Sequence, residues 1–166
     1  MTVGGPSLNP LPSPLPRRPE TTWAVTRGVA RLLIELGDAP LAEVGLPNGR
    51  RADLMALGPR GQIMIVEVKS SVEDYRADLK WGEYGPYCDS FYFAVPPHFP
   101  RELLPQGAGT IVADGFGGAI LAEAEQRLLP AARRKALTLA FARLGALRAA
   151  GVAAPMDDQT PSSATL

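Results

Sequence analysis

Residues 51–69 read RADLMALGPRGQIMIVEVK, and this stretch decides the fold. Two apolar runs flank a Gly-Pro-Arg-Gly segment, and these residue types favour a tight turn. The pattern therefore predicts a β-hairpin made of strands 51–57 and 63–69. Glu67 and Lys69 are unusual here, because a charged side chain near the end of a buried strand is costly to desolvate. Something about that position must need them.

The register of this hairpin brings charged residues together. If the turn closes symmetrically, the numbers of opposed residues sum to 120, so Asp53 faces Glu67 and Arg51 faces Lys69. Side chains alternate between the faces of a strand, so Glu67 and Lys69 point the same way. A slip of one residue would send Asp53 to the opposite face, which the sequence does not exclude.

Two carboxylates at such close quarters suit a hard cation. Mg²⁺ is typically held by one or two carboxylates, with water and substrate phosphate filling the other positions. A neighbouring lysine can orient an attacking water molecule or stabilise charge that develops on a phosphoryl oxygen. Asp53, Glu67 and Lys69 are therefore the candidate catalytic residues of a phosphodiesterase.

This arrangement resembles a known motif. Asp53, thirteen intervening residues and then Glu67-Val68-Lys69 are similar to the PD-(D/E)xK motif of the restriction-endonuclease-like nucleases. Position 52 is alanine where the motif has proline, a departure that removes no chemical group. The resemblance implies that Asp53, Glu67 and the backbone carbonyl of Val68 hold the metal, and that Lys69 positions the water. A further carboxylate is expected from the first helix or the first strand, and Glu43 on the strand is preferred to Glu35 on the helix for that role.

Other segments resemble the bacterial MmcB-like family, whose endonuclease label is itself an inference from the fold. They are residues 46–53, 66–71, 74–81, 87–89, 93–96, 111–114 and 133–139, and the likeness runs from about Thr22 to Ala150. The resemblance implies an endonuclease acting on DNA in repair, with Mg²⁺ as cofactor and Mn²⁺ as a substitute. It also makes DNA and other DNA-repair proteins the expected partners, and a homodimer is compatible with it.

The order of expected elements fits an α/β fold with a restriction-endonuclease-like core, in which a central mixed sheet is flanked by helices. Apolar residues recur at helical spacing after Thr22, and Gly37 suits the end of that helix. Ser71 and Asp74 form a capping signature for a second helix that carries Arg76 and Lys80. The remaining expected elements are strands 41–46, 90–95, 110–113 and 119–122 and a last helix over 131–150.

Composition indicates one domain. The chain has 166 residues, of which 46% are hydrophobic, and we expect a single domain over 21–150. The first twenty residues are rich in proline and residues 151–166 are small and polar, so both ends are predicted to be disordered tails. The single cysteine, Cys88, allows no internal disulfide, and we expect it to be buried. No stretch suggests a membrane span or a signal peptide, so we expect a cytoplasmic, nucleoid-associated protein.

Charge bears on how DNA is held. Lys plus Arg and Asp plus Glu both number 17, so a DNA-binding surface would have to be local. Arg50, Arg51, Arg76 and Lys80 are the candidate phosphate contacts. Trp81 is the preferred candidate for stacking on bases within an aromatic cluster that also holds Tyr84 and Tyr87. The basic run 133–135 is more simply explained as solvated surface charge, and Trp81 has an ordinary alternative as a core residue.

Three alternatives remain open for the function. The charged residues of the hairpin could form a structural ion-pair cluster without a catalytic role, although buried ion pairs seldom stabilise more than apolar packing does. The chain could be a catalytically silent DNA-binding or scaffold protein in a repair complex. It could also be a metal-dependent hydrolase of RNA or nucleotides.

Overall fold

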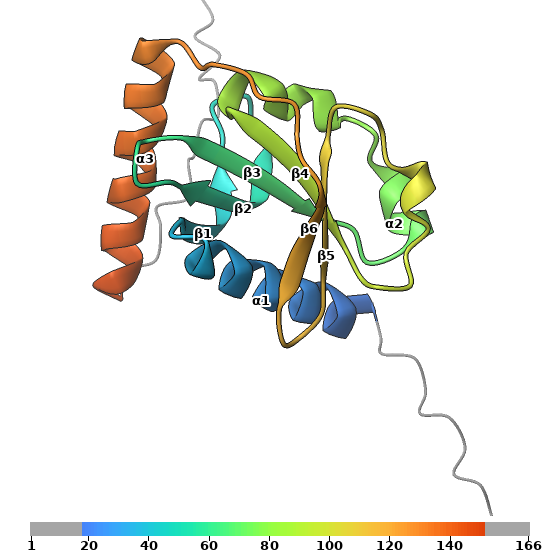
Figure 1. Cartoon of the computed structure of the whole chain (residues 1–166). Coiled ribbons are helices and arrows are strands. Elements are labelled where there is room, and N and C mark those ends of the chain that lie inside the picture. The colour runs from blue at the N-terminus through green and yellow to red at the C-terminus, as the bar shows by residue number, and fades with distance from the viewer. Residues whose placement is uncertain (1–17, 152–166) are drawn as a thin grey trace, which may run out of the picture.

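The computed structural model describes residues 18–151, which form a six-stranded mixed sheet flanked by helices (Figure 1). This confirms the expected α/β class and the predicted order of elements, whereas the expected tails fall almost entirely outside the described residues. The strands lie in the order of the sequence: β1 (Ala39–Gly45), β2 (Arg51–Leu57), β3 (Ile63–Val68), β4 (Ser90–Val95), β5 (Gly109–Ala113) and β6 (Gly118–Ala122). The helices are α1 (Arg18–Glu35), α2 (Val72–Ala77), α3 (Ala131–Ala149) and the 3-10 helices η1 (Trp81–Tyr87) and η2 (Arg101–Leu103).

The hairpin of β2 and β3 has the predicted register. Leu54 pairs with Val66, and Met55 pairs with Ile65, so opposed residue numbers sum to 120. The turn is closed by a hydrogen bond of 2.9 Å from the Gly58 amide to the Gln62 carbonyl. Gly61 has a φ of +84°, which a glycine adopts without the steric penalty of a side chain.

The centre of the sheet is parallel and covered on both faces. β3 pairs in parallel with β4, and β4 with β5, whereas the outer pairs are antiparallel. Every residue of β4 is buried, as expected for a parallel strand covered by helices on both sides. Val29 and Leu33 of α1 pack on one face of the sheet, and η1 and α3 cover the other.

Helix α1 lies close against the β5–β6 turn. A Cβ atom at Gly28 would lie 2.1 Å from the carbonyl oxygen of Asp114, so only glycine allows this approach. The helix begins at Arg18, earlier than the expected start at Thr22, and so includes three residues assigned to the N-terminal tail. It ends as expected, with Gly37 at a φ of +89°.

Helix α2 is shorter than the sequence suggested. Ser71 caps it as predicted, since its side chain accepts a hydrogen bond from the Asp74 amide. The helix ends at Ala77, so Lys80 does not share a helical face with Arg76 as expected. Asp78 takes an extended conformation instead, and Lys80 precedes η1.

Helix α3 stands beside the turn of the β2–β3 hairpin (Figure 1). Arg134 makes two hydrogen bonds of 2.6 Å to the carboxylate of Asp89 and one of 2.7 Å to the Gly61 carbonyl. Cys88, the neighbour of Asp89, is buried, as predicted. None of the helices within residues 18–151 combines the length and apolar character needed to cross a bilayer.

Candidate active site

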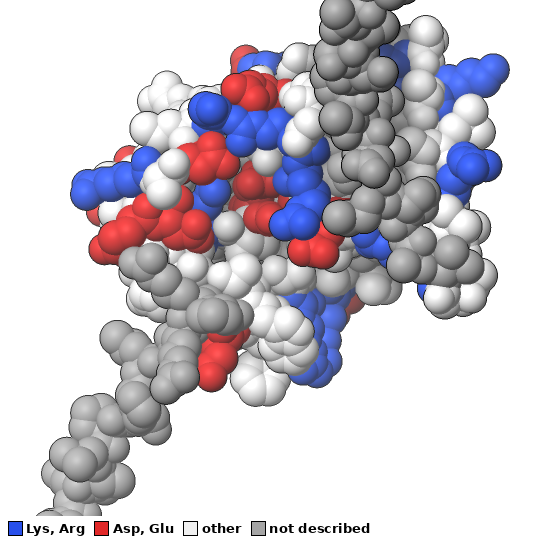
Figure 2. Space-filling view, turned by 180° about the vertical axis from the view of Figure 1, so that it is seen from behind, with Lys and Arg blue, Asp and Glu red and all other residues white. Residues whose placement is uncertain are grey.

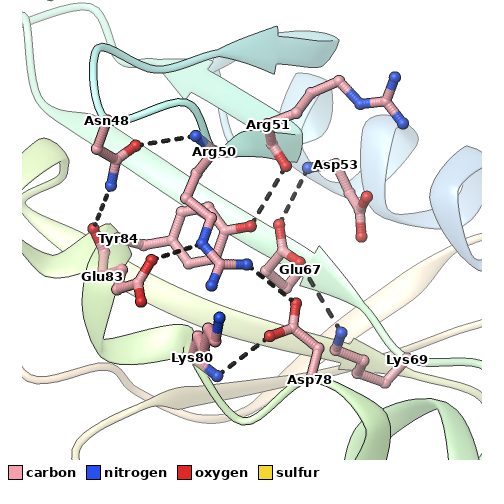
Figure 3. Close-up of polar contacts among 10 residues, drawn as sticks. All are labelled: Asn48, Arg50, Arg51, Asp53, Glu67, Lys69, Asp78, Lys80, Glu83 and Tyr84. Atoms are coloured by element: carbon pink, nitrogen blue, oxygen red, sulfur yellow. Dashed lines mark hydrogen bonds and ion pairs between the residues drawn. The ribbon is translucent and has the colours of Figure 1, made fainter.

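A cleft of about 460 Å³ lies at the end of the β2–β3 hairpin that is remote from its turn. Residues from both strands, from α1, from α2 and from the segment around η1 line it. They are Thr22, Gly49, Arg50, Arg51, Asp53, Glu67, Val68, Lys69, Asp74, Ala77, Asp78 and Tyr84. The structure thus brings the three predicted catalytic residues into one cleft (Figure 3).

The side chains of Asp53 and Glu67 join β2 to β3 at the point where the regular backbone pairing stops. The amide of Asp53 donates a hydrogen bond of 3.2 Å to Oε1 of Glu67. The amide of Val68 donates one of 2.8 Å to Oδ2 of Asp53. Each carboxylate therefore uses an oxygen to bind a backbone amide of the opposite strand, which fixes the two acids relative to one another.

The alternation of faces breaks at Asp53. Leu54 belongs to the core beneath α1, whereas Ala52 belongs to the core on the opposite face, although residues two apart in a regular strand share a face. On the neighbouring strand, Glu43 has a φ of +51°, which is uncommon for a residue with a side chain. Such irregularities in strands often redirect side chains at functional sites. Here the irregularity lies beside Asp53.

Lys69 lies almost fully inside the protein. Its ammonium is 4.0 Å from Oε2 of Glu67, and both side chains are more than nine-tenths buried. Its amide donates a hydrogen bond of 2.9 Å to the Ala94 carbonyl, which continues the pairing of β3 with β4. The lysine is thus held on the rigid centre of the sheet, next to the two carboxylates.

Burial changes the acidity of both carboxyl groups. Desolvation, followed by the nearby charge of Asp53, raises the pKa of Glu67 to about 7, despite opposing hydrogen bonds and the charge of Lys69. Desolvation also raises the pKa of Asp53 above its usual value. Carboxylates that repel each other in this way bind a cation favourably, because the cation relieves both the repulsion and the desolvation.

The donor set fits a hard metal ion. Asp53, Glu67 and the Val68 carbonyl could supply oxygen ligands, and the open cleft leaves room for water and a phosphate group. Within residues 18–151, no group of three or more His, Cys, Asp or Glu side chains is close enough to hold a metal ion. A metal here would thus rely on few protein ligands, as Mg²⁺ commonly does.

Three further residues that were not expected among the catalytic or metal-binding groups also line the cleft. Tyr84 is buried, and its hydroxyl donates a hydrogen bond of 3.3 Å to the Arg51 carbonyl. Arg50 binds Glu83 at 2.6 Å and Asp78 at 3.4 Å, so ion pairs form the rim (Figure 3). Asp74 also faces the cleft, and its charge raises the pKa of Asp53 further. Arg50 was expected as a phosphate contact, Tyr84 as a neighbour of Trp81, and Asp74 as the partner of Ser71 in the capping signature.

Of the residues predicted to contact DNA, Arg50 and Arg51 line this cleft, whereas Arg76, Lys80 and Trp81 do not. The Arg51 guanidinium is two-thirds exposed and lies 3.7 Å from Glu43, so it does not join Lys69 as the register suggested. Arg76 and Lys80 are exposed. Trp81 packs against Phe91, with ring centroids 5.6 Å apart, and does not line the cleft.

Charges of both signs share the surface. On the back of the molecule, Lys and Arg side chains lie close to Asp and Glu side chains around a hollow (Figure 2). This agrees with the equal numbers of acidic and basic residues in the chain. A nucleic acid would therefore meet local positive groups rather than a broad basic face.

Comparison with known proteins identifies the family. A solved structure, the SPO1766 protein of unknown function from Silicibacter pomeroyi, is 39% identical, with a TM-score of 0.74 over 82% of this chain and 97% of that one. No curated protein matches significantly. The family model described as DNA repair protein MmcB-like matches residues 9–156. The chain therefore belongs to the MmcB-like family of DNA repair proteins.

Proposed function

We propose that this protein is a Mg²⁺-dependent endonuclease that hydrolyses phosphodiester bonds of DNA during repair. The observation that carries the proposal is the grouping of Asp53, Glu67 and Lys69 in one cleft. Membership of a DNA-repair family supports DNA as the substrate. In this proposal Mn²⁺ can replace Mg²⁺.

The roles of the residues follow from their positions. Asp53 and Glu67, with the Val68 carbonyl, would hold the metal, which when bound polarises the phosphate and lowers the pKa of water. Lys69, fixed beside Glu67, orients the attacking water and stabilises charge on a phosphoryl oxygen. Arg51, Arg76 and Lys80 are exposed and available to contact phosphates next to the cleft.

A purely structural ion-pair cluster explains the site less well. Such a cluster would use Arg51 to neutralise the second carboxylate, but Arg51 turns outward to Glu43. Lys69 is left beside the buried Glu67 and the half-buried Asp53, an arrangement that costs stability unless a further cation completes it. This excess of negative charge favours a metal site over a structural role.

A cleavage panel tests the proposal. Plasmid, single-stranded, flapped and mismatched DNA are incubated with the protein in Mg²⁺ or in EDTA. We expect cleavage only with Mg²⁺, and a rate lowered at least about 100-fold by Lys69→Met, which removes a charge close to the reacting phosphate. Lys135→Met is the matched control and should keep most of the activity, because Lys135 is exposed on α3 and does not line the cleft.

The outcomes separate the alternatives. Cleavage that Lys69→Met leaves unchanged would contradict the proposed site. A wild-type chain that binds DNA but cuts no substrate in the panel would instead support a scaffold role. Cleavage of RNA in preference to every DNA would reassign the substrate while keeping the chemistry.

A further inference from the structure

We propose that Trp23, on α1, forms a stacking subsite for an unpaired nucleobase directly beside the carboxylate site. The inference rests on the proposed function for the nature of its ligand, a nucleic acid. It goes further in naming the class of substrate: DNA with a single-stranded or extruded nucleotide next to the bond that is cut.

Trp23 is exposed beside the candidate active site. Its side chain is 63% exposed, although tryptophan is usually largely buried. It lines a second cleft, of about 610 Å³, together with Thr22, Thr26, Ala42, Glu43, Asp53, Ser70 and Asp74. Thr22, Asp53 and Asp74 also line the cleft that holds Glu67 and Lys69. The two clefts thus share walls, and Asp53 belongs to both.

Arg27 covers one face of the Trp23 ring. Its guanidinium lies over the indole ring, 5.3 Å from the centroid, one helical turn along α1. Proteins that hold single-stranded nucleic acids use aromatic platforms of this kind, with arginine adding cation–π attraction and positive charge. With Arg27 over one face of the ring, a base can stack on the other.

The character of this cleft favours a base over a phosphate. Its charged lining side chains are Glu43, Asp53 and Asp74, all acidic, and they repel a phosphate group. Trp23 and Ala42 offer a flat, mainly apolar surface instead. A nucleotide would therefore place its phosphate towards Lys69 and the metal ligands and its base on Trp23.

This geometry selects unpaired DNA. Inside a duplex each base is stacked between its neighbours and shows only its edges, so its flat face cannot reach a protein side chain. A base that lies on Trp23 must come from a single strand, a flap or an extruded nucleotide. The other tryptophan cannot serve in the same way, because Trp81 packs on Phe91 and Phe93.

Binding of a fluorescent oligo(dT) to the full-length chain tests the subsite. Anisotropy is measured in EDTA at low salt, where metal-dependent cleavage does not interfere, with a duplex of equal length as the second ligand. We expect Trp23→Ala to weaken oligo(dT) binding about tenfold, from the cost of losing one stacked base, and Trp23→Phe to retain most of the affinity. Ile34→Ala removes an equally exposed apolar side chain from the same helix and should have no effect.

Circular dichroism establishes that each variant is folded, which is expected because Trp23 is exposed. A lower affinity of Trp23→Ala for oligo(dT), with unchanged affinity for the duplex, supports the subsite. Unchanged oligo(dT) binding, an equal loss for the duplex, or no binding by the wild-type chain overturns it. Trp23-dependent binding by a chain that cuts nothing would refute the proposed endonuclease alone, so the two failures are distinguishable.

Discussion

Glu67 shows most clearly how the fold alters the chemistry of one residue. It lies at the end of a central strand, is 5% exposed, and has Asp53 as its neighbour. These surroundings favour the protonated acid and raise its pKa to about 7. Without a metal, Glu67 of the folded protein therefore keeps its proton at mildly acidic pH, where the same carboxyl of the unfolded chain is already ionised.

This proton uptake makes stability depend on pH. Because the pKa of Glu67 is raised on folding, its effect favours the folded state below about pH 4.5 and is lost as the pH rises to about 7. In EDTA, wild type should thus lose stability relative to Glu67→Gln between pH 5 and 8, by up to about 3 kcal/mol. Urea denaturation of both proteins across this range measures the difference. A constant difference, or one that changes in the opposite sense, would contradict the raised pKa.

At the residue scale, the sequence predicted the centre of the site better than its rim. Asp53, Glu67 and Lys69 were expected together because strand alternation and a closed turn fix their relative positions. Arg51 was expected to face Lys69, but its guanidinium lies 3.7 Å from Glu43. The positive φ of Glu43 and the change of face at Asp53 occur in the same stretch, and no residue type there signals either.

Among the helices, strands and turns, some boundaries are set by local residue types and others by tertiary contacts. The turn between β2 and β3 and the start of α2 were predictable, because glycine, proline and capping residues act locally. The early end of α2 was not, since Asp78 leaves the helix and pairs with Arg50, a residue 28 positions away. Trp81 was likewise proposed for DNA but packs on Phe91, a contact that only the folded sheet creates.

The attachment of α3 is also a tertiary feature that the sequence did not show. Arg134 appeared to be part of a solvated basic run, yet it binds Asp89 through both of its terminal nitrogens. The Asp89 carboxylate also accepts hydrogen bonds from the amides of Ile63 and Leu129. One buried acid thus joins β3, the segment before α3 and α3 itself.

Asp89→Asn should therefore destabilise the protein strongly. The amide cannot accept all four of these hydrogen bonds, and Arg134 loses its counter-charge, so we expect a cost of about 3–5 kcal/mol. Chemical denaturation measures the free energy of unfolding. Arg143→Gln, an exposed change on α3, is the control and should alter stability by less than about 0.5 kcal/mol. A similar small effect for Asp89→Asn would show that this carboxylate does not anchor α3.

At the scale of the whole molecule, the α/β class and the order of elements followed from the sequence, and the arrangement of clefts did not. The second cleft is lined by residues of α1, β1, β2 and the start of α2, and α1 packs closely on the sheet where Gly28 meets the β5–β6 turn. This packing sets Trp23 beside Asp53, residues 30 positions apart whose proximity no spacing rule predicts. The balanced charge of the chain further limits how many phosphates it can contact at once.

The proposed function depends above all on a site for a divalent cation at Asp53 and Glu67. Calorimetric titration of the metal-free protein with Mn²⁺ at pH 7.5 tests it most directly. We expect wild type to bind the ion. Asp53→Asn and Glu67→Gln, each nearly the same size as the residue replaced, should abolish binding, while Glu83→Gln on the rim should preserve it. Binding that survives both Asp53→Asn and Glu67→Gln, or a wild-type protein that binds no ion, would rule out a metal site at these two carboxylates.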